Sequence, residues 1–163
     1  MVTINSDRDI EWNNARNLLG DLKIMGRLTI KCKISIPQGG NVIVEDGGRL
    51  IIDQGLFKNA CDNEWGKIIV KSGGLLEMNS TNISDYNIIV ESGGTIILNG
   101  NIEITGNHNI TVKTGAYICV KNGTVIELSD IYSVIRVLEN VNIGINPNLS
   151  IQTYCVSSWV KSV

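Results

Sequence analysis

The chain has 163 residues, a formal net charge of −2 and 43% hydrophobic residues, which suits one domain with a sizeable core. The slightly acidic balance argues against a nucleic-acid-binding protein, which would carry a basic patch. No run of about 18 apolar residues occurs, so we predict no membrane span. The first residues have neither the basic nor the apolar stretch that is typical of a signal peptide.

One phrase recurs along the chain: an aliphatic run, a glycine-rich corner and a second aliphatic run. Its four copies are "VIVEDGGRLII" (42–52), "IIVKSGGLLEM" (68–78), "IIVESGGTIIL" (88–98) and "ITVKTGAYICV" (110–120). The second corner residue recurs at steps of 22, 26, 20 and 22 residues, at Gly26, Gly48, Gly74, Gly94 and Ala116. A period near 22 is typical of one turn of a β-solenoid.

Residues 88–109 divide into three short strands separated by bends rich in glycine and asparagine, which tolerate positive φ. We therefore predict an all-β fold, a right-handed parallel β-helix (β-solenoid) with three short strands per coil of about 22 residues. About six coils would stand about 30 Å tall. Because solenoid ends need capping, we assign residues 1–19, which do not fit the repeat, to an N-terminal cap, 20–143 to the solenoid and 144–163 to a C-terminal cap.

The alternation of side chains along each strand predicts which of them enter the core. The predicted inward positions are all apolar: Val42, Val44, Leu50, Ile52, Ile68, Val70, Leu76, Met78, Ile88, Val90, Ile96, Leu98, Ile110, Val112, Ile118 and Val120. Outward positions beside them carry charges of alternating sign about 4.8 Å apart. This predicted charge ladder, which favours the correct register, consists of Glu45, Lys71, Glu91 and Lys113.

A stripe of isoleucines also points outward, at Ile43, Ile69 and Ile89, and beyond the corner at Ile51 and Ile97. Such a stripe is either covered by another segment or serves as a contact surface. We favour cover, by a loop within residues 55–65 or by a terminal segment. The candidate interaction face comprises Ile43, Ile69, Ile89, Arg27 and Arg49.

An enzyme of the pectate-lyase type would need clustered carboxylates for calcium and a basic residue for proton abstraction. The column formed by Asp46, Ser72, Ser92 and Thr114 supplies only one acid. Stacked Arg27 and Arg49 are better explained as a solvated pair than as an anion site. His108 is better explained as a solvated turn residue, and "DNE" (62–64) alone is a weak calcium motif. We predict no catalytic, cofactor-binding or metal-binding residues.

The four cysteines form no CxxC pair, so we expect no structural zinc site. Cys119 lies at an outward position and can meet Cys155 in the C-terminal tract, while Cys61 can reach back to Cys32. The residues leave two alternatives open: disulfides Cys32–Cys61 and Cys119–Cys155, each worth about 2–4 kcal/mol, or four free thiols in a cytosolic protein. We favour the disulfides.

The stretch 20–70 carries a run from Leu28 through Thr29, Ile30 and Lys31 to Cys32, then Pro37, paired glycine corners, Asn59-Ala60-Cys61 and Trp65. It resembles β-helical segments of large secreted and cell-surface proteins of Bacteroidetes-type bacteria, which often end in a type IX secretion sorting domain. The stretch 115–149 resembles the closing part of such segments, with Ile118-Cys119-Val120 and Asn146-Pro147. The resemblance implies export and both disulfides, although this sequence shows neither a signal peptide nor a sorting domain.

We predict a non-catalytic structural or interaction module, a rigid spacer or adhesive display segment of a secreted or cell-surface bacterial protein. Its expected partner is a glycan or another surface protein, with no nucleic acid and no cofactor. One alternative is a carbohydrate-binding or polysaccharide-degrading β-helix that holds glycan on one long face. Another alternative is a component of a phage particle, a fibre or a decoration protein.

Overall fold

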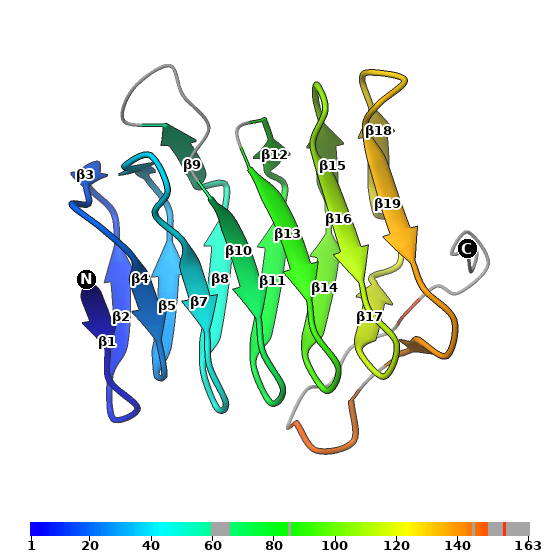
Figure 1. The fold of residues 1–163 in the computed structure, drawn as a ribbon, viewed down its shortest axis with the longest axis horizontal. Coiled ribbons are helices and arrows are strands. Elements are labelled where there is room, and N and C mark those ends of the chain that lie inside the picture. The colour runs from blue at the N-terminus through cyan, green and yellow to red at the C-terminus, as the bar shows by residue number, and fades with distance from the viewer. Residues whose placement is uncertain (60–65, 85, 145, 150–154, 156–163) are drawn as a thin grey trace.

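The computed structural model describes residues 1–59, 66–84, 86–144, 146–149 and 155, and every element within them is a β-strand. The strands wind into a parallel β-solenoid, as predicted, whose first and last coils lie at the left and right of Figure 1. Coils 1 to 6 contain three strands each, in chain order from β1–β3 to β16–β18. Coil 7 contains the two strands β19 and β20.

Two walls of the solenoid are seven-stranded parallel sheets. Sheet A takes the first strand of each coil: β1 (Val2–Ile4), β4 (Leu22–Ile24), β7 (Val42–Val44), β10 (Lys67–Val70), β13 (Asn87–Val90), β16 (Asn109–Val112) and β19 (Val134–Val137). Sheet B takes the second: β2 (Asp9–Trp12), β5 (Arg27–Ile30), β8 (Arg49–Asp53), β11 (Leu75–Asn79), β14 (Thr95–Asn99), β17 (Tyr117–Val120) and β20 (Asn142–Ile143).

The third wall consists of two separate three-stranded sheets. Sheet C contains β3 (Arg16–Asn17), β6 (Lys33–Ile36) and β9 (Leu56–Asn59). Sheet D contains β12 (Asn82–Ile83), β15 (Asn101–Ile104) and β18 (Val125–Leu128). The loop predicted within 55–65 therefore starts later than expected, because residues 56–59 form β9, and residues 60–65 lie outside the described part.

At the break between sheets C and D, side chains replace the backbone ladder. The hydroxyl of Thr81 donates to the carbonyl oxygen of Gly55 at 2.8 Å. Inside, the rings of Phe57 and Tyr86 meet edge to face, with centroids 5.9 Å apart and planes at 78°. This aromatic pair lies in a core that is otherwise mostly aliphatic, apart from Trp12 in coil 1.

The interior of the solenoid is apolar, and the inward assignment is confirmed. Each of the sixteen side chains predicted to point inward is at most 2% exposed. Burial of a side chain of this size is worth about 1.5–3 kcal/mol. The core therefore provides the main driving force for stacking the coils.

The corner between sheets A and B repeats because neighbouring coils touch there. The backbone N–H of Gly47 donates to the carbonyl of Gly73 at 3.1 Å, and that of Gly73 to the carbonyl of Gly93 at 3.0 Å. These glycines have φ near +75°, a region that other residues enter at a cost. The next corner glycine has another reason: a Cβ on Gly48 would clash with the carbonyl oxygen of Ile24. The glycines are therefore stacked, as the repeat predicted.

Residues 1–19 form a complete coil, so the expectation that they do not fit the repeat is wrong. Strands β1, β2 and β3 each pair in parallel with the corresponding strand of coil 2. Asp9 pairs with Arg27, so Arg8 stands where later coils have Gly26 or Gly48. Within the described residues no coil lies beneath coil 1, so a side chain at Arg8 meets no earlier carbonyl. Whether this coil acts as a cap stays a prediction.

The charge ladder on sheet A forms as predicted. The Lys71 ammonium lies 3.3 Å from a Glu45 carboxylate oxygen, and the Lys113 ammonium lies 3.5 Å from Glu91. Lys23, which pairs with Ile43 in the adjacent column, also reaches Glu45 at 3.4 Å. These side chains are partly exposed, so each contact contributes modestly to stability.

Candidate functional site

The predicted interaction residues lie on two different walls. Ile43, Ile69 and Ile89 stack on sheet A and are half-buried. Arg27 and Arg49 stack on sheet B. The structure therefore does not bring the two sets into one face. Arg27 also has an acidic neighbour that we did not expect, since Asp9 shares its column and lies 3.5 Å from its guanidinium.

The only histidine is buried, contrary to the expectation of a solvated turn residue. His108 is 9% exposed, and its Nδ1 has no hydrogen-bond partner within the described residues. It precedes β16, and its carbonyl accepts a bond from the N–H of Val134 in coil 7. The described residues place no group of three histidine, cysteine or acidic side chains together as a metal site would require.

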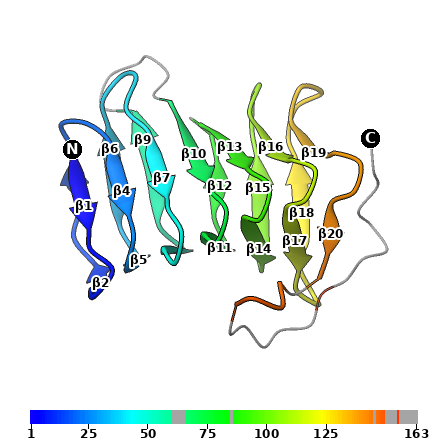
Figure 2. The ribbon, with the colours of Figure 1, turned by 60° about the horizontal axis from the view of Figure 1, so that its bottom comes forward.

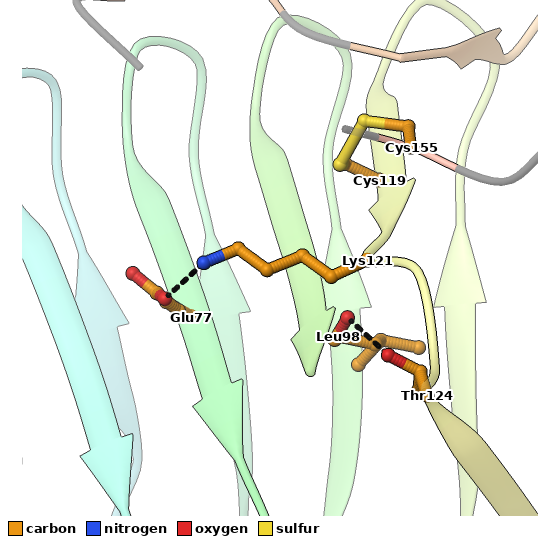
Figure 3. The surroundings of a disulfide bond; sticks show 6 residues. All are labelled: Glu77, Leu98, Cys119, Lys121, Thr124 and Cys155. Atoms are coloured by element: carbon orange, nitrogen blue, oxygen red, sulfur yellow. Dashed lines mark hydrogen bonds and ion pairs between the residues drawn. A yellow bond between two sulfur atoms is a disulfide. The ribbon is translucent and has the colours of Figure 1, made fainter. Parts of the chain in front are cut away.

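One predicted disulfide, Cys119–Cys155, is present, with the two Cα atoms 5.0 Å apart (Figure 3). Cys119 lies in β17 on the outer face of sheet B, and Lys121 forms an isolated antiparallel bridge with Cys155. Figure 3 also shows the ammonium of Lys121 reaching back to the carboxylate of Glu77, 3.2 Å away. The disulfide thus joins the C-terminal tract to coil 6.

The other predicted pair, Cys32–Cys61, stays a prediction because Cys61 lies outside the described residues. Cys32 is a partly buried free thiol in the structure. Burial raises the pKa of this thiol above its usual value. A thiol with a raised pKa stays protonated at neutral pH and is a poor nucleophile, so Cys32 is not suited to covalent catalysis.

The C-terminal tract covers part of the outward apolar stripe. After β20 the chain turns back beneath the later coils (Figure 2). Leu149 and Cys155 pack on a second apolar cluster on the outer face of sheet B, formed by Leu75, Ile97 and Cys119, each at most 3% exposed. The favoured prediction of cover by a terminal segment is therefore confirmed for Ile97. It is not confirmed for the isoleucines of sheet A.

A polar contact fixes the same tract at its start. The side-chain amide of Asn146 donates to the hydroxyl of Thr95 at 3.3 Å, and both residues are at least 97% buried. The side-chain oxygen Oδ1 of Asn146 accepts from the backbone N–H of Asn148 at 3.0 Å. Both the nitrogen and the oxygen of the Asn146 side-chain amide therefore have partners, and the side chain holds the turn against coil 5.

A groove of about 690 Å³ runs between this tract and the corner of sheets A and B. Its residues come from coils 3 to 6 and from the tract: Asp46, Gly47, Ser72, Gly73, Ser92, Gly93, Gly115, Tyr117, Asn146, Asn148 and Leu149. Sequence reasoning found the column of Asp46, Ser72 and Ser92 but missed the opposite wall. The predicted Cys119–Cys155 bond was the signal that could have placed Asn146 and Asn148 over sheet B.

A second hollow of about 460 Å³ lies on the third wall, near the break between sheets C and D. Glu103 and Glu127, which pair in register, both line it. The Glu103 carboxylate accepts bonds from Asn82 at 3.1 Å and from Ser129 at 2.8 Å. Its oxygens are therefore used within the protein, which makes this hollow the weaker candidate.

The described part of the chain holds no helix that is long and apolar enough to span a membrane. No protein-family model, no curated protein and no solved structure matches this chain. The assignment of the fold and of the groove is therefore based on this chain alone.

Proposed function

We propose that this chain is a rigid structural module of a secreted or cell-surface bacterial protein, which spaces or displays other parts of that protein. The observation that carries the proposal is the pair of seven-stranded walls, in unbroken register over an aliphatic interior. Each coil contacts mainly its neighbours, so the module's length follows from the number of coils. A rigid module of this kind holds whatever is attached to its two ends at a fixed distance.

The disulfide supports the proposed location. Structural disulfides persist in oxidising compartments and are rare in the cytosol. Cys119–Cys155 lies on the outer face of sheet B and holds the C-terminal tract against it, which is the role of a structural disulfide. The resemblance of residues 20–70 to β-helical segments of exported Bacteroidetes-type proteins points the same way.

Rigidity can be measured between the first and the sixth strand of sheet A. Thr3 and Thr111 stand in one outward column, five strand spacings apart along the paired registers. Nitroxide-bearing non-natural residues at these positions would leave the cysteines intact. Pulsed electron-electron resonance should then give one narrow distance distribution centred near the backbone separation of about 24 Å, plus the label arms. A broad or bimodal distribution would contradict the rigid module.

The location has its own test. Protein recovered from its native host is alkylated without reductant and digested, and the Cys119 and Cys155 peptides are weighed. We expect the two peptides to be recovered as a disulfide-linked pair. Recovery of both as alkylated free thiols would contradict export, while the rigidity measurement would be unaffected.

A further inference from the structure

The C-terminal tract forms one wall of the groove beside the A–B corner, and a disulfide, an apolar contact and a hydrogen bond hold this wall in place. Cys155 is bonded to Cys119, Leu149 packs on the outer cluster of sheet B, and Asn146 binds Thr95. Three separate contacts therefore hold this wall in place before any ligand arrives. A preformed wall lowers the entropic cost of binding.

The opposite wall presents polar side chains at the spacing of the coils. Asp46, Ser72 and Ser92 follow one another in coils 3, 4 and 5, and all three are exposed. The oxygens of Ser72 and Ser92 lie directly over the glycines of the next coil, where a Cβ on Gly93 or Gly115 would clash with them. None of the hydrogen bonds among the described residues uses these hydroxyls, so they remain available to a ligand.

The lining excludes several ligand classes. Among the described residues that line the groove there is no lysine or arginine, and Asp46 is acidic, which disfavours a polyanion. The corner N–H groups of Gly47, Gly73 and Gly93 already donate to the next coil, so a peptide strand finds no free ladder there. Of the lining residues that the structure describes, Tyr117 and Leu149 alone are large and apolar, too few for an apolar small molecule.

Hydroxyls, amides and one aromatic ring together suit a ligand that carries many hydroxyl groups on a chain of apolar-faced rings. Tyr117, in the last of the four coils that line the groove, carries an aromatic ring and a phenolic hydroxyl. Ser72 and Ser92 offer groups that both donate and accept, and Asn148 offers an exposed side-chain amide. We infer that the groove binds a neutral oligosaccharide, laid along the solenoid axis across coils 3 to 6. The inference deepens the proposed display role and rests on it only for its biological setting.

The direct test is isothermal titration calorimetry of the oxidised full chain. The five ligands are cellohexaose, maltohexaose, laminarihexaose, mannohexaose and xylohexaose. We expect at least one of them to bind. Y117A should then weaken binding at least tenfold and S92A several-fold. T111A, on sheet A of coil 6 and outside the groove, should bind like the parent chain. Circular dichroism and the melting temperature establish that each variant is folded.

Reduction supplies a second readout. With an excess of a dithiol reductant, the Cys119–Cys155 bond breaks, two thiols form and the reductant becomes a cyclic disulfide. Because the wall loses its covalent tether, binding should weaken several-fold while the sheets stay folded. C119S/C155S should reproduce this loss without reductant.

The proposal is overturned by any of three results: no hexasaccharide binds, the affinity of Y117A or S92A equals that of the parent chain, or T111A loses binding as well. A failure here is distinguishable from failure of the structural role. The spin-label distance between Thr3 and Thr111 reports rigidity whether or not sugar binds.

Discussion

Between coils 3 and 4, sheets A and B continue without interruption, whereas the third wall divides into sheets C and D. From coil 3 to coil 6, the step between paired residues is 26, then 20, then 22 on both sheet A and sheet B. Over coils 3 to 6 the corner between these sheets therefore keeps a constant length, and the third wall takes up the variation. The corner of coil 2 is two residues shorter, since the step from coil 2 to coil 3 is 20 on sheet A and 22 on sheet B. Two walls set the stacking, and the third accommodates differences in chain length.

The two kinds of wall differ in how neighbouring coils meet. Across sheets A and B, glycine corners allow carbonyls of the previous coil to approach closely. At the break in the third wall, Thr81 bonds to Gly55 and the rings of Phe57 and Tyr86 touch. Local side-chain contacts at this point take the place of the ladder.

The largest expected effect comes from a charge in a continuous wall. V90D would place an unpaired carboxylate in the fully buried interior of sheet A, at a cost of at least about 4 kcal/mol. We expect loss of the β-sheet circular dichroism signal at room temperature. I89D, one residue away and half-buried on the outer face, should stay folded. A folded V90D would mean that the inward assignment is wrong.

A pair of truncations compares the two kinds of wall directly. Leu76 in sheet B and Ile83 in sheet D are both fully buried. Truncation of such side chains to alanine costs about 2–5 kcal/mol, depending on how well the site collapses. L76A should fall at the upper end, and I83A at the lower end because β12 pairs on one side only among the strands that the structure describes. Urea unfolding at equilibrium measures both, and equal losses would argue that the break has no energetic meaning.

Removal of the disulfide tests the tract that crosses sheet B. C119S/C155S should lose about 2–4 kcal/mol, as expected when a cross-link no longer restricts the unfolded chain. T111A, on sheet A and away from the disulfide, serves as the control. Urea midpoints under non-reducing conditions provide the comparison. A C119S/C155S midpoint equal to that of T111A would show that the bond is dispensable.

A corner substitution probes the close approach of two coils. G48A should cost about 1–3 kcal/mol, because its Cβ meets the carbonyl oxygen of Ile24 and the backbone must shift. R8A occupies the same column in coil 1, where the described residues place no carbonyl of an earlier coil, and should change the melting temperature little. Similar losses in the two variants would indicate that stacking does not select glycine here.

The smallest effect is expected on the surface of sheet A. K71E would replace the cation bound to Glu45 by a like charge, costing up to about 1 kcal/mol at low salt. K71Q should cost less, because it removes the attraction without adding repulsion. Thermal melts at low and high salt should converge for K71E and the parent chain. A salt-independent difference would mean that the charge ladder does not act through electrostatics.

The two sheets that meet at the glycine-rich corner could be predicted from the sequence. The third wall, whose corners lack a regular glycine, could not. Glycine corners that recur every 20 to 26 residues predicted the coils, the inward columns and the charge ladder. Coil 1 escaped notice because Arg8 replaces the glycine. The second corner was harder to place because Gln54 and Ser80 adopt φ of 58° and 48° there, at the position where coil 5 has a glycine, Gly100.

The groove was predictable only in part. The column of Asp46, Ser72 and Ser92 follows from the repeat, since its members occupy equivalent corner positions. Asn146 and Asn148 belong to a tract without periodicity, so no pattern placed them over sheet B. Only the cysteine pair connected that tract to coil 6. His108 was misjudged because a corner position says nothing about the later coil that packs against it.

The constant A–B corner has a consequence for modifying this molecule. Sheets A and B set the rise from one coil to the next, and the third wall sets the perimeter of each coil. A foreign sequence inserted between β9 and β10 should therefore widen that coil without changing the spacing between coils. A peptide epitope grafted there would stand at a fixed height along the rod, and tandem grafts in successive turns would form an evenly spaced array.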